Sequence, residues 1–95
     1  MSHYTKGRRL EYKTMRVLEA AGYYATRSAG SKGLWDVIGI SSQETLLVQV
    51  KANDWPGSLE MEQMELFQAH PRCRKIIHRW RDRARQPDVL EVKSG

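Results

Sequence analysis

Two apolar runs joined by a polar turn make up residues 35–51, WDVIGISSQETLLVQVK. The runs, at 35–40 and 46–51, have the lengths and the β-branched residues that strands favour, and the polar residues 41–45 between them are typical of a hairpin turn. The segment therefore predicts two antiparallel strands whose side chains alternate between the two faces of a sheet.

Two helices and three more strands are expected around the hairpin. The first helix, from about Tyr4 to Ala21, is amphipathic and ends at Gly22, a residue typical of helix C-caps. The second, from about Leu59 to Ala69, follows Ser58 as its N-cap and has acidic residues in its first turn, where the helix dipole favours them. The three strands are expected at 23–27, 73–80 and 88–92. The order α-β-β-β-α-β-β predicts one α+β domain over residues 1–95, with a mixed central sheet flanked by helices.

Composition narrows the class of protein. The chain has 95 residues, of which 40% are hydrophobic, and a mean hydropathy of -0.66, values expected of a soluble globular domain. Neither a membrane span nor a signal peptide is expected, because the sequence lacks an apolar run of about 20 residues and its first residues are polar. The one cysteine, Cys73, excludes an internal disulfide and fits a reducing cytoplasm, or a host cytoplasm if the protein is viral.

The excess of basic over acidic residues indicates a polyanionic partner. The net charge is +5 and the pI is about 9.7, which suits DNA because phosphate neutralisation releases counterions. The densest basic tract, residues 72–85, could grip a duplex arm, or it could be a solvated edge hairpin whose charges discourage aggregation. Trp55 and Trp80 could stack on bases, although cores and dimer interfaces use tryptophan as often. The histidines show no metal-ligand spacing, so a zinc site is not expected.

Four polar side chains are expected to gather at one end of the hairpin. Antiparallel pairing places Asp36, at the start of one strand, near Gln49 and Lys51, which share a face at the end of the other. On a helical wheel Glu11 falls inside the apolar arc of the first helix and could point at the same spot. Carboxylate and amide oxygens suit Mg²⁺, and a lysine can orient or help deprotonate an attacking water. Such a cluster could hold a metal ion against a scissile phosphate.

Three of these residues also have a structural explanation. Asp36 could cap the loop that precedes its strand, Lys51 could be a solvated charge at a strand end, and Glu11 could form an ion pair with Arg27. A carboxylate in an apolar arc costs desolvation unless it is paired or bound to a metal. One metal site is favoured because it explains all three residues at once.

Five segments of the sequence resemble the archaeal-type Holliday junction resolvases, whose fold is a PD-(D/E)xK nuclease core. The segments span about residues 6–53, over half of the chain, and the string RSAGS is the most specific of them. In order, they are Gly7-Arg8-x-x-Glu11, Gly22-Tyr23, Arg27-Ser28-Ala29-Gly30-Ser31, Asp36-Val37-Ile38 and Val48-Gln49-Val50-Lys51.

The resemblance implies a homodimeric, structure-selective endonuclease of DNA recombination and repair. It implies cleavage of two opposed strands of a four-way junction with a divalent metal, Mg²⁺ or Mn²⁺ in its place. By position it makes Glu11, Asp36 and Gln49 metal ligands, Lys51 the catalytic lysine and Ser31 a loop serine associated with activity. A small core gives a second reason to dimerise. The candidate DNA contacts, from the resemblance and from the basic tract, are Arg8, Arg9, Arg27, Ser28, Lys32, Arg79 and Arg81.

Gln49 departs from the family pattern, which has glutamate there. An amide can still donate one oxygen to a metal, but the site loses a negative charge. Two alternatives therefore stay open. One is a nuclease of the viral replication-repair type, acting on flaps or other branched DNA, with a glutamine (here Gln63) early in the second helix. The other is a degenerate domain that only binds DNA or a partner.

A literal copy of the superfamily motif occurs at residues 87–93, PDVLEVK. Its two acids, Asp88 and Glu91, are three positions apart on one expected strand, so their side chains point to opposite faces. A working site needs acids on neighbouring strands. This segment is therefore interpreted as the last strand of the sheet.

Overall fold

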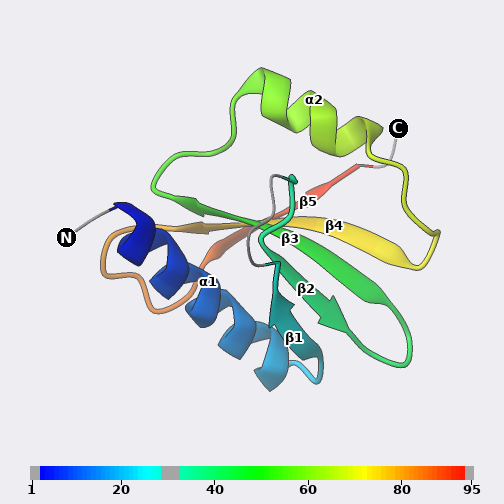
Figure 1. Cartoon of the computed structure of the whole chain (residues 1–95), viewed down its shortest axis with the longest axis horizontal. Helices are drawn as coiled ribbons and strands as arrows, with labels where there is room; N and C mark the ends of the chain where they lie inside the picture. The colour runs from blue at the N-terminus through cyan, green and yellow to red at the C-terminus, as the bar shows by residue number, and fades with distance from the viewer. Residues whose placement is uncertain (1–2, 29–32, 94–95) are drawn as a thin grey trace.

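A computed structural model describes residues 3–28 and 33–93, with the side chains of the first helix described from Gly7 onward. The five strands form one sheet in the order β1-β2-β3-β4-β5. The helix α1 covers one face of this sheet and α2 covers the other (Figure 1). The predicted element order and mixed sheet are confirmed. The elements are α1 (His3–Ala20), β1 (Tyr24–Arg27), β2 (Val37–Ile40), β3 (Thr45–Ala52), α2 (Ser58–Leu66), β4 (Cys73–Trp80) and β5 (Asp88–Val92).

The sheet combines hairpins with one crossover. β1, β2 and β3 are antiparallel neighbours, as are β4 and β5, whereas β3 and β4 run parallel. A parallel pair needs a long connection, and here α2 provides it by crossing over the second face of the sheet. In this register Gln49 lies opposite Ile77, and Lys51 lies opposite Arg79.

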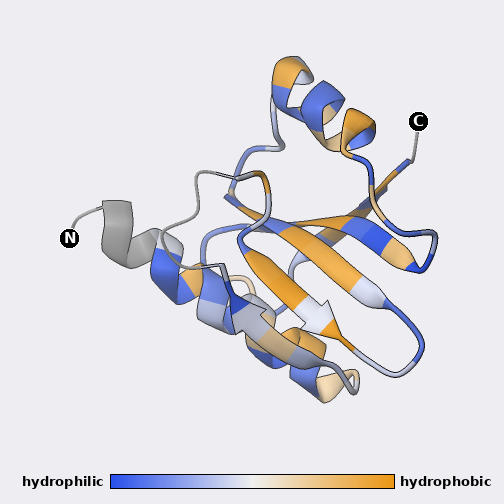
Figure 2. Cartoon of the chain, turned by 45° about the vertical axis from the view of Figure 1, so that its right-hand side comes forward, coloured by the Kyte–Doolittle hydropathy of each residue, from blue (hydrophilic) through white to orange (hydrophobic). Residues whose placement is uncertain are grey.

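The α1 face carries the larger apolar cluster. Its buried members come from α1 and from four strands: Leu18, Ala25, Val37, Leu46, Val48 and Ile76. Gly39 of β2 lets α1 approach closely, because a Cβ at that position would lie 2.9 Å from Leu18 Cδ1. The hydropathy colouring in Figure 2 shows the apolar residues concentrated on the strands between the two helices.

The α2 face has a smaller cluster and one buried charge. Trp35, Met64, Ile77 and Val92 form the cluster. Beside it the Lys75 side chain is 2% exposed, and its Nζ donates to the carbonyl oxygens of Met64, Glu65 and Phe67 at 2.7, 3.0 and 3.1 Å. A lysine in this place satisfies carbonyls that the end of a helix leaves without partners.

These contacts explain where the helices differ from the predictions. The helix α2 ends at Leu66, three residues before the predicted Ala69, because Phe67 is extended and Lys75 binds the terminal carbonyls. Gly57, not Ser58, occupies its N-cap position. The helix α1 ends at Ala20, one residue before the predicted Ala21, which is exposed. On its buried face a polar residue, Thr14, lies beside Leu10 and Leu18.

Thr14 is buried because it bonds to two side chains of β4. Trp80 Nε1 donates to Thr14 Oγ1 at 2.9 Å, and Thr14 Oγ1 lies 3.1 Å from His78 Nδ1. A hydroxyl that accepts from the indole can donate its own hydrogen to Nδ1, which requires a neutral imidazole. Burial lowers the pKa of His78 to about 4, in agreement with that arrangement.

Within the described part of the chain, no helix is long and apolar enough to cross a membrane.

Candidate active site

Asp36 lies immediately before β2 and is fixed to β3. Its backbone N–H donates to the Val48 carbonyl at 2.8 Å, and its Oδ2 accepts from the Val50 N–H, also at 2.8 Å. The carboxylate therefore bonds across the hairpin to β3. This is the register that the sequence predicted, and it places Asp36 beside the segment that carries Gln49 and Lys51.

The pKa of Asp36 reflects the charged residues around it. Burial raises the pKa of its carboxyl, and the bond from the Val50 N–H partly offsets this effect. The negative charges of Glu11 and Glu60 raise the pKa further, whereas the charge of Lys51 lowers it. Carboxylates from α1 and α2 and a lysine from β3 thus act on one half-buried carboxyl group.

Gln49 and Lys51 share the face of β3 that α2 covers. The Gln49 side chain is buried, and its Nε2 donates to the Leu34 carbonyl at 3.2 Å and to Glu60 Oε2 at 3.1 Å. The Lys51 Nζ lies 3.5 Å from Glu60 Oε1. Both predicted site residues of β3 therefore meet the same carboxylate.

Glu60 is a residue that the sequence analysis missed. Its position in the first turn of α2 has an adequate local explanation, since acidic side chains are favoured at helix N-termini. The one signal that could have pointed to Glu60 was the topology of the chain. A helix that connects two parallel strands must cross one face of the sheet, and the face that carries Gln49 and Lys51 was one of two choices.

Glu11 forms the ion pair that was expected as its structural alternative. Its Oε1 accepts from Arg27 Nε at 2.9 Å, and the Arg27 guanidinium lies 5.0 Å from the centre of the Tyr12 ring. Glu11 nevertheless lies next to Asp36. Both border an open hollow of about 310 Å³, which Asn53 also lines.

The oxygen atoms of this region suit a hard divalent cation. Asp36 and Glu60 offer carboxylates, and Gln49 offers an amide oxygen that is buried without a hydrogen-bond partner in the described part of the chain. Such donors are the ligands Mg²⁺ prefers. Among the described residues, however, no three His, Cys, Asp or Glu side chains lie close enough together to form a metal cluster by themselves.

The residues predicted to contact DNA differ in their exposure and in their ion pairs. Arg79 Nη2 and Arg81 Nε lie 2.7 and 2.9 Å from Asp88 Oδ2, so one carboxylate partly neutralises both charges. Arg8 and Arg9 are exposed on α1. Ser28 is half-buried, and its N–H donates to the Asp36 carbonyl at 2.9 Å. Two further predicted residues, Ser31 and Lys32, lie outside the described residues.

The literal motif at 87–93 has a structural role. Asp88 binds the two arginines just named, and Glu91 Oε1 lies 2.8 Å from Arg74 Nη2. Both acids are on β5, at the edge of the sheet and two strands from Gln49 and Lys51. The interpretation of this segment as the last strand is confirmed.

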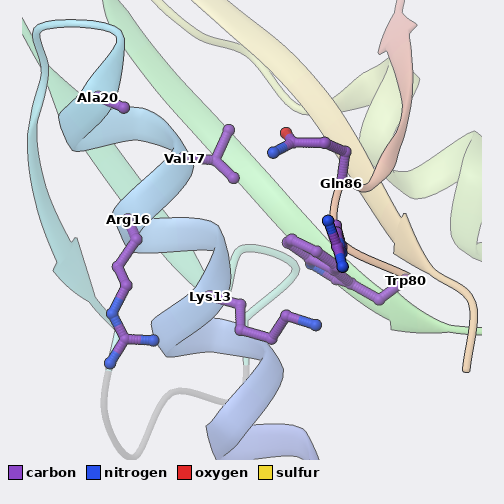
Figure 3. Close-up of a pocket in the computed structure, with 7 residues that line it drawn as sticks. Lys13, Arg16, Val17, Ala20, Trp80 and Gln86 are labelled. Carbon is purple, nitrogen blue, oxygen red and sulfur yellow. The ribbon is translucent and has the colours of Figure 1, made fainter. Parts of the chain in front are cut away.

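A second hollow, of about 350 Å³, lies on another side of α1. Figure 3 shows Lys13 and Val17 of α1 facing Trp80 and Gln86 across it. Lys13 is already engaged, because its Nζ donates to the Ala84 carbonyl at 3.0 Å and lies 4.3 Å from the centre of the Trp80 ring. Trp80 is 2% exposed, so it belongs to the core and has no free face on which a base could stack.

The sequence matches no known protein-family model and no curated protein. Among solved structures it is similar to Archaeoglobus fulgidus Hjc, a Holliday junction resolvase from an archaeal hyperthermophile. The TM-score is 0.73, the sequence identity is 24%, and the alignment covers 92% of this chain and 73% of that one. The chain therefore has the fold of an archaeal Holliday junction resolvase.

Proposed function

We propose that this chain is a metal-dependent, structure-selective DNA endonuclease that resolves four-way junctions by paired strand cleavage. The observation that carries the proposal is the meeting of Asp36, Gln49 and Lys51 at one end of the β2–β3 hairpin, on the fold of a resolvase. The net charge of +5 supports a DNA substrate. Residues 1–95 would act as one nuclease domain.

The side chains divide the chemistry between them. Asp36 and a neighbouring carboxylate would hold Mg²⁺, or Mn²⁺ in its place, with the Gln49 amide oxygen as a further ligand. When bound, such an ion polarises the scissile phosphate and lowers the pKa of an attacking water. The ammonium group of Lys51 would orient that water and offset the charge that develops on the phosphate. Burial and the charges of Glu11 and Glu60 raise the pKa of Asp36, and a bound cation would lower it by favouring the ionised form.

A cleavage assay on a four-way junction tests the proposal. With Mg²⁺ the wild-type chain should cut two opposed strands, and without the metal it should bind the junction uncut. Asp36→Asn and Lys51→Ala should each lower the cleavage rate by about two orders of magnitude or more, with junction binding in EDTA nearly unchanged. Glu91→Gln, in the literal motif, is the matched control and should cut normally. Substantial cleavage by Asp36→Asn would refute the assignment.

The same assay separates the two alternative functions. Preference for flaps or nicked duplexes over four-way junctions would favour a nuclease of the viral replication-repair type. The Gln63 expected for that type is exposed on α2, and Glu60 makes the contacts to Gln49 and Lys51 instead. A wild-type chain that binds junctions but cuts no branched DNA with either metal would favour a degenerate binding domain.

Paired cleavage also implies a homodimer. Two symmetric cuts call for two sites related by a two-fold axis, which a closed dimer supplies. Light scattering at micromolar concentration should therefore give twice the mass of the 11.0 kDa chain. A species of single-chain mass, both with and without junction DNA, would contradict this part of the proposal.

A further inference from the structure

The carboxylates around Asp36 are not equally available. Glu11 is bound at 2.9 Å by Arg27, whose charge neutralises it. Glu60 faces the Gln49 amide, which is neutral, and the Lys51 ammonium group at the longer distance of 3.5 Å. Its side chain is also 37% exposed, so an ion could reach it from solvent. Of Glu11 and Glu60, the two carboxylates whose charges act on Asp36, Glu60 is therefore the one that can still neutralise a cation.

Gln49 holds this carboxylate and leaves an oxygen beside it. The residue is 5% exposed, and both Nε2 bonds go to acceptors, the Leu34 carbonyl and Glu60 Oε2. These acceptors fix the orientation of the amide, since a flipped group would set oxygen against oxygen. The Oε1 atom on the same carbon is then buried with no hydrogen-bond partner among the described residues. A buried oxygen without a partner is costly, and a cation is one kind of group that would satisfy it.

We infer that Glu60 is the second acidic ligand of the divalent ion, and that Gln49 positions it opposite Asp36. The negative charge that a glutamate at position 49 would supply comes here from α2. In this arrangement Gln49 contributes through both ends of its amide, with Nε2 orienting Glu60 and Oε1 facing the ion. The inference rests on the proposed function for the identity of the ion as Mg²⁺ or Mn²⁺.

Binding of Mn²⁺ to the full chain without DNA tests the inference directly. In isothermal titration calorimetry, Glu60→Gln should weaken binding about tenfold or more, as expected for the loss of one charge-assisted contact. Glu62→Gln is the matched control, because it makes the same change of charge on the same helix at an exposed position. It should bind Mn²⁺ within about twofold of wild type. Circular dichroism on each variant verifies that α2 remains folded.

A charge exchange sharpens the test. The double variant Gln49→Glu/Glu60→Gln moves the carboxylate from α2 to β3 without changing the net charge of the site. Its Mn²⁺ affinity should return to within about threefold of wild type, whereas Glu60→Gln alone stays weak. Failure of this rescue would show that Glu60 matters only as a structural contact.

The outcomes distinguish this inference from the proposed function. If wild type cuts junctions while Glu60→Gln binds Mn²⁺ as wild type does, Glu60 is not a ligand and the nuclease assignment stands. If Glu60→Gln selectively weakens Mn²⁺ binding while wild type cuts no branched DNA, the metal site stands and the function is wrong. Equal losses in Glu60→Gln and Glu62→Gln, or no Mn²⁺ binding by wild type at millimolar concentration, would overturn the inference.

Discussion

The two faces of the sheet treat buried polar groups differently. On the α1 face, Thr14 Oγ1 bonds to both Trp80 Nε1 and His78 Nδ1, so these three buried polar atoms all have partners and form a closed network. On the α2 face, Gln49 bonds to the start of the covering helix and keeps one buried oxygen without a partner among the described residues. A closed network stabilises a core, whereas an open one leaves capacity for a ligand. The comparison therefore separates a structural face from a candidate functional one.

Two lysines repeat this contrast within the α2 face. Lys75 lies under the C-terminal end of α2, is 2% exposed and donates to three carbonyls. Lys51 lies near the N-terminal end, and its side chain is 31% exposed with Glu60 at 3.5 Å. The first contact set is short and complete, which is typical of a structural role. The contact of Lys51 is long and open to solvent, which leaves the ammonium group accessible for the role proposed above.

The largest effect on stability is expected from a fall in pH, because acid protonates His78, a member of the closed network on the α1 face. The unfolded chain protonates His78 at the ordinary pKa of 6.5, but the folded chain does so only near pH 4, because burial disfavours the charged imidazole. The free energy of unfolding should therefore fall by about 3 kcal/mol as the pH drops from 6.5 to 4, and above 6.5 this contribution is constant. Urea unfolding across this range measures it.

The matched control for this prediction is His78→Gln, which removes the titrating group. The difference in unfolding free energy between wild type and this variant should shrink as the pH falls from 6.5 to 4. If this difference in unfolding free energy did not depend on pH, His78 would not be held neutral. The hydrogen bonds assigned to the α1 face would then be contradicted.

A smaller loss of stability is expected for Lys75→Met, which keeps most of the side-chain volume. The change removes three charge-assisted hydrogen bonds from the end of α2 and should lower the free energy of unfolding by about 2 kcal/mol. Lys51→Met should cost under about 1 kcal/mol, because its ion pair is partly exposed. Urea unfolding compares the two variants. Equal costs would remove the distinction drawn between the two lysines.

A loss of stability smaller than that of Lys75→Met is expected for Gly39→Ala, on the apolar face. The added Cβ would meet Leu18 Cδ1 at 2.9 Å, and this flexible side-chain end can shift. The free energy of unfolding should fall by about 1 kcal/mol. Gly7→Ala is the control, since nothing lies within 4 Å of its Cβ, and it should stabilise α1 slightly. A neutral Gly39→Ala would show that α1 packs less closely on β2 than the distance indicates.

Local patterns in the sequence were sufficient for the elements and for three residues of the candidate site, Asp36, Gln49 and Lys51. Period-two alternation and the polar turn predicted the hairpin and its register, because a one-residue slip would move the apolar side chains to the other face and the length of the turn limits larger slips. That register brings Asp36 to β3 beside Gln49 and Lys51. The rejection of the literal motif on β5 followed from the same alternation.

The rest depended on contacts between elements that are distant in the sequence. Only the path of α2 over the sheet decides that Glu60 meets Gln49 and Lys51, since an acid in the first turn of a helix is unremarkable by itself. The burial of Thr14 and Lys75 is decided in the same way, by partners on β4 and α2 that no local window contains. Periodicity determines which face of an element a residue occupies. The tertiary structure alone determines what that face meets.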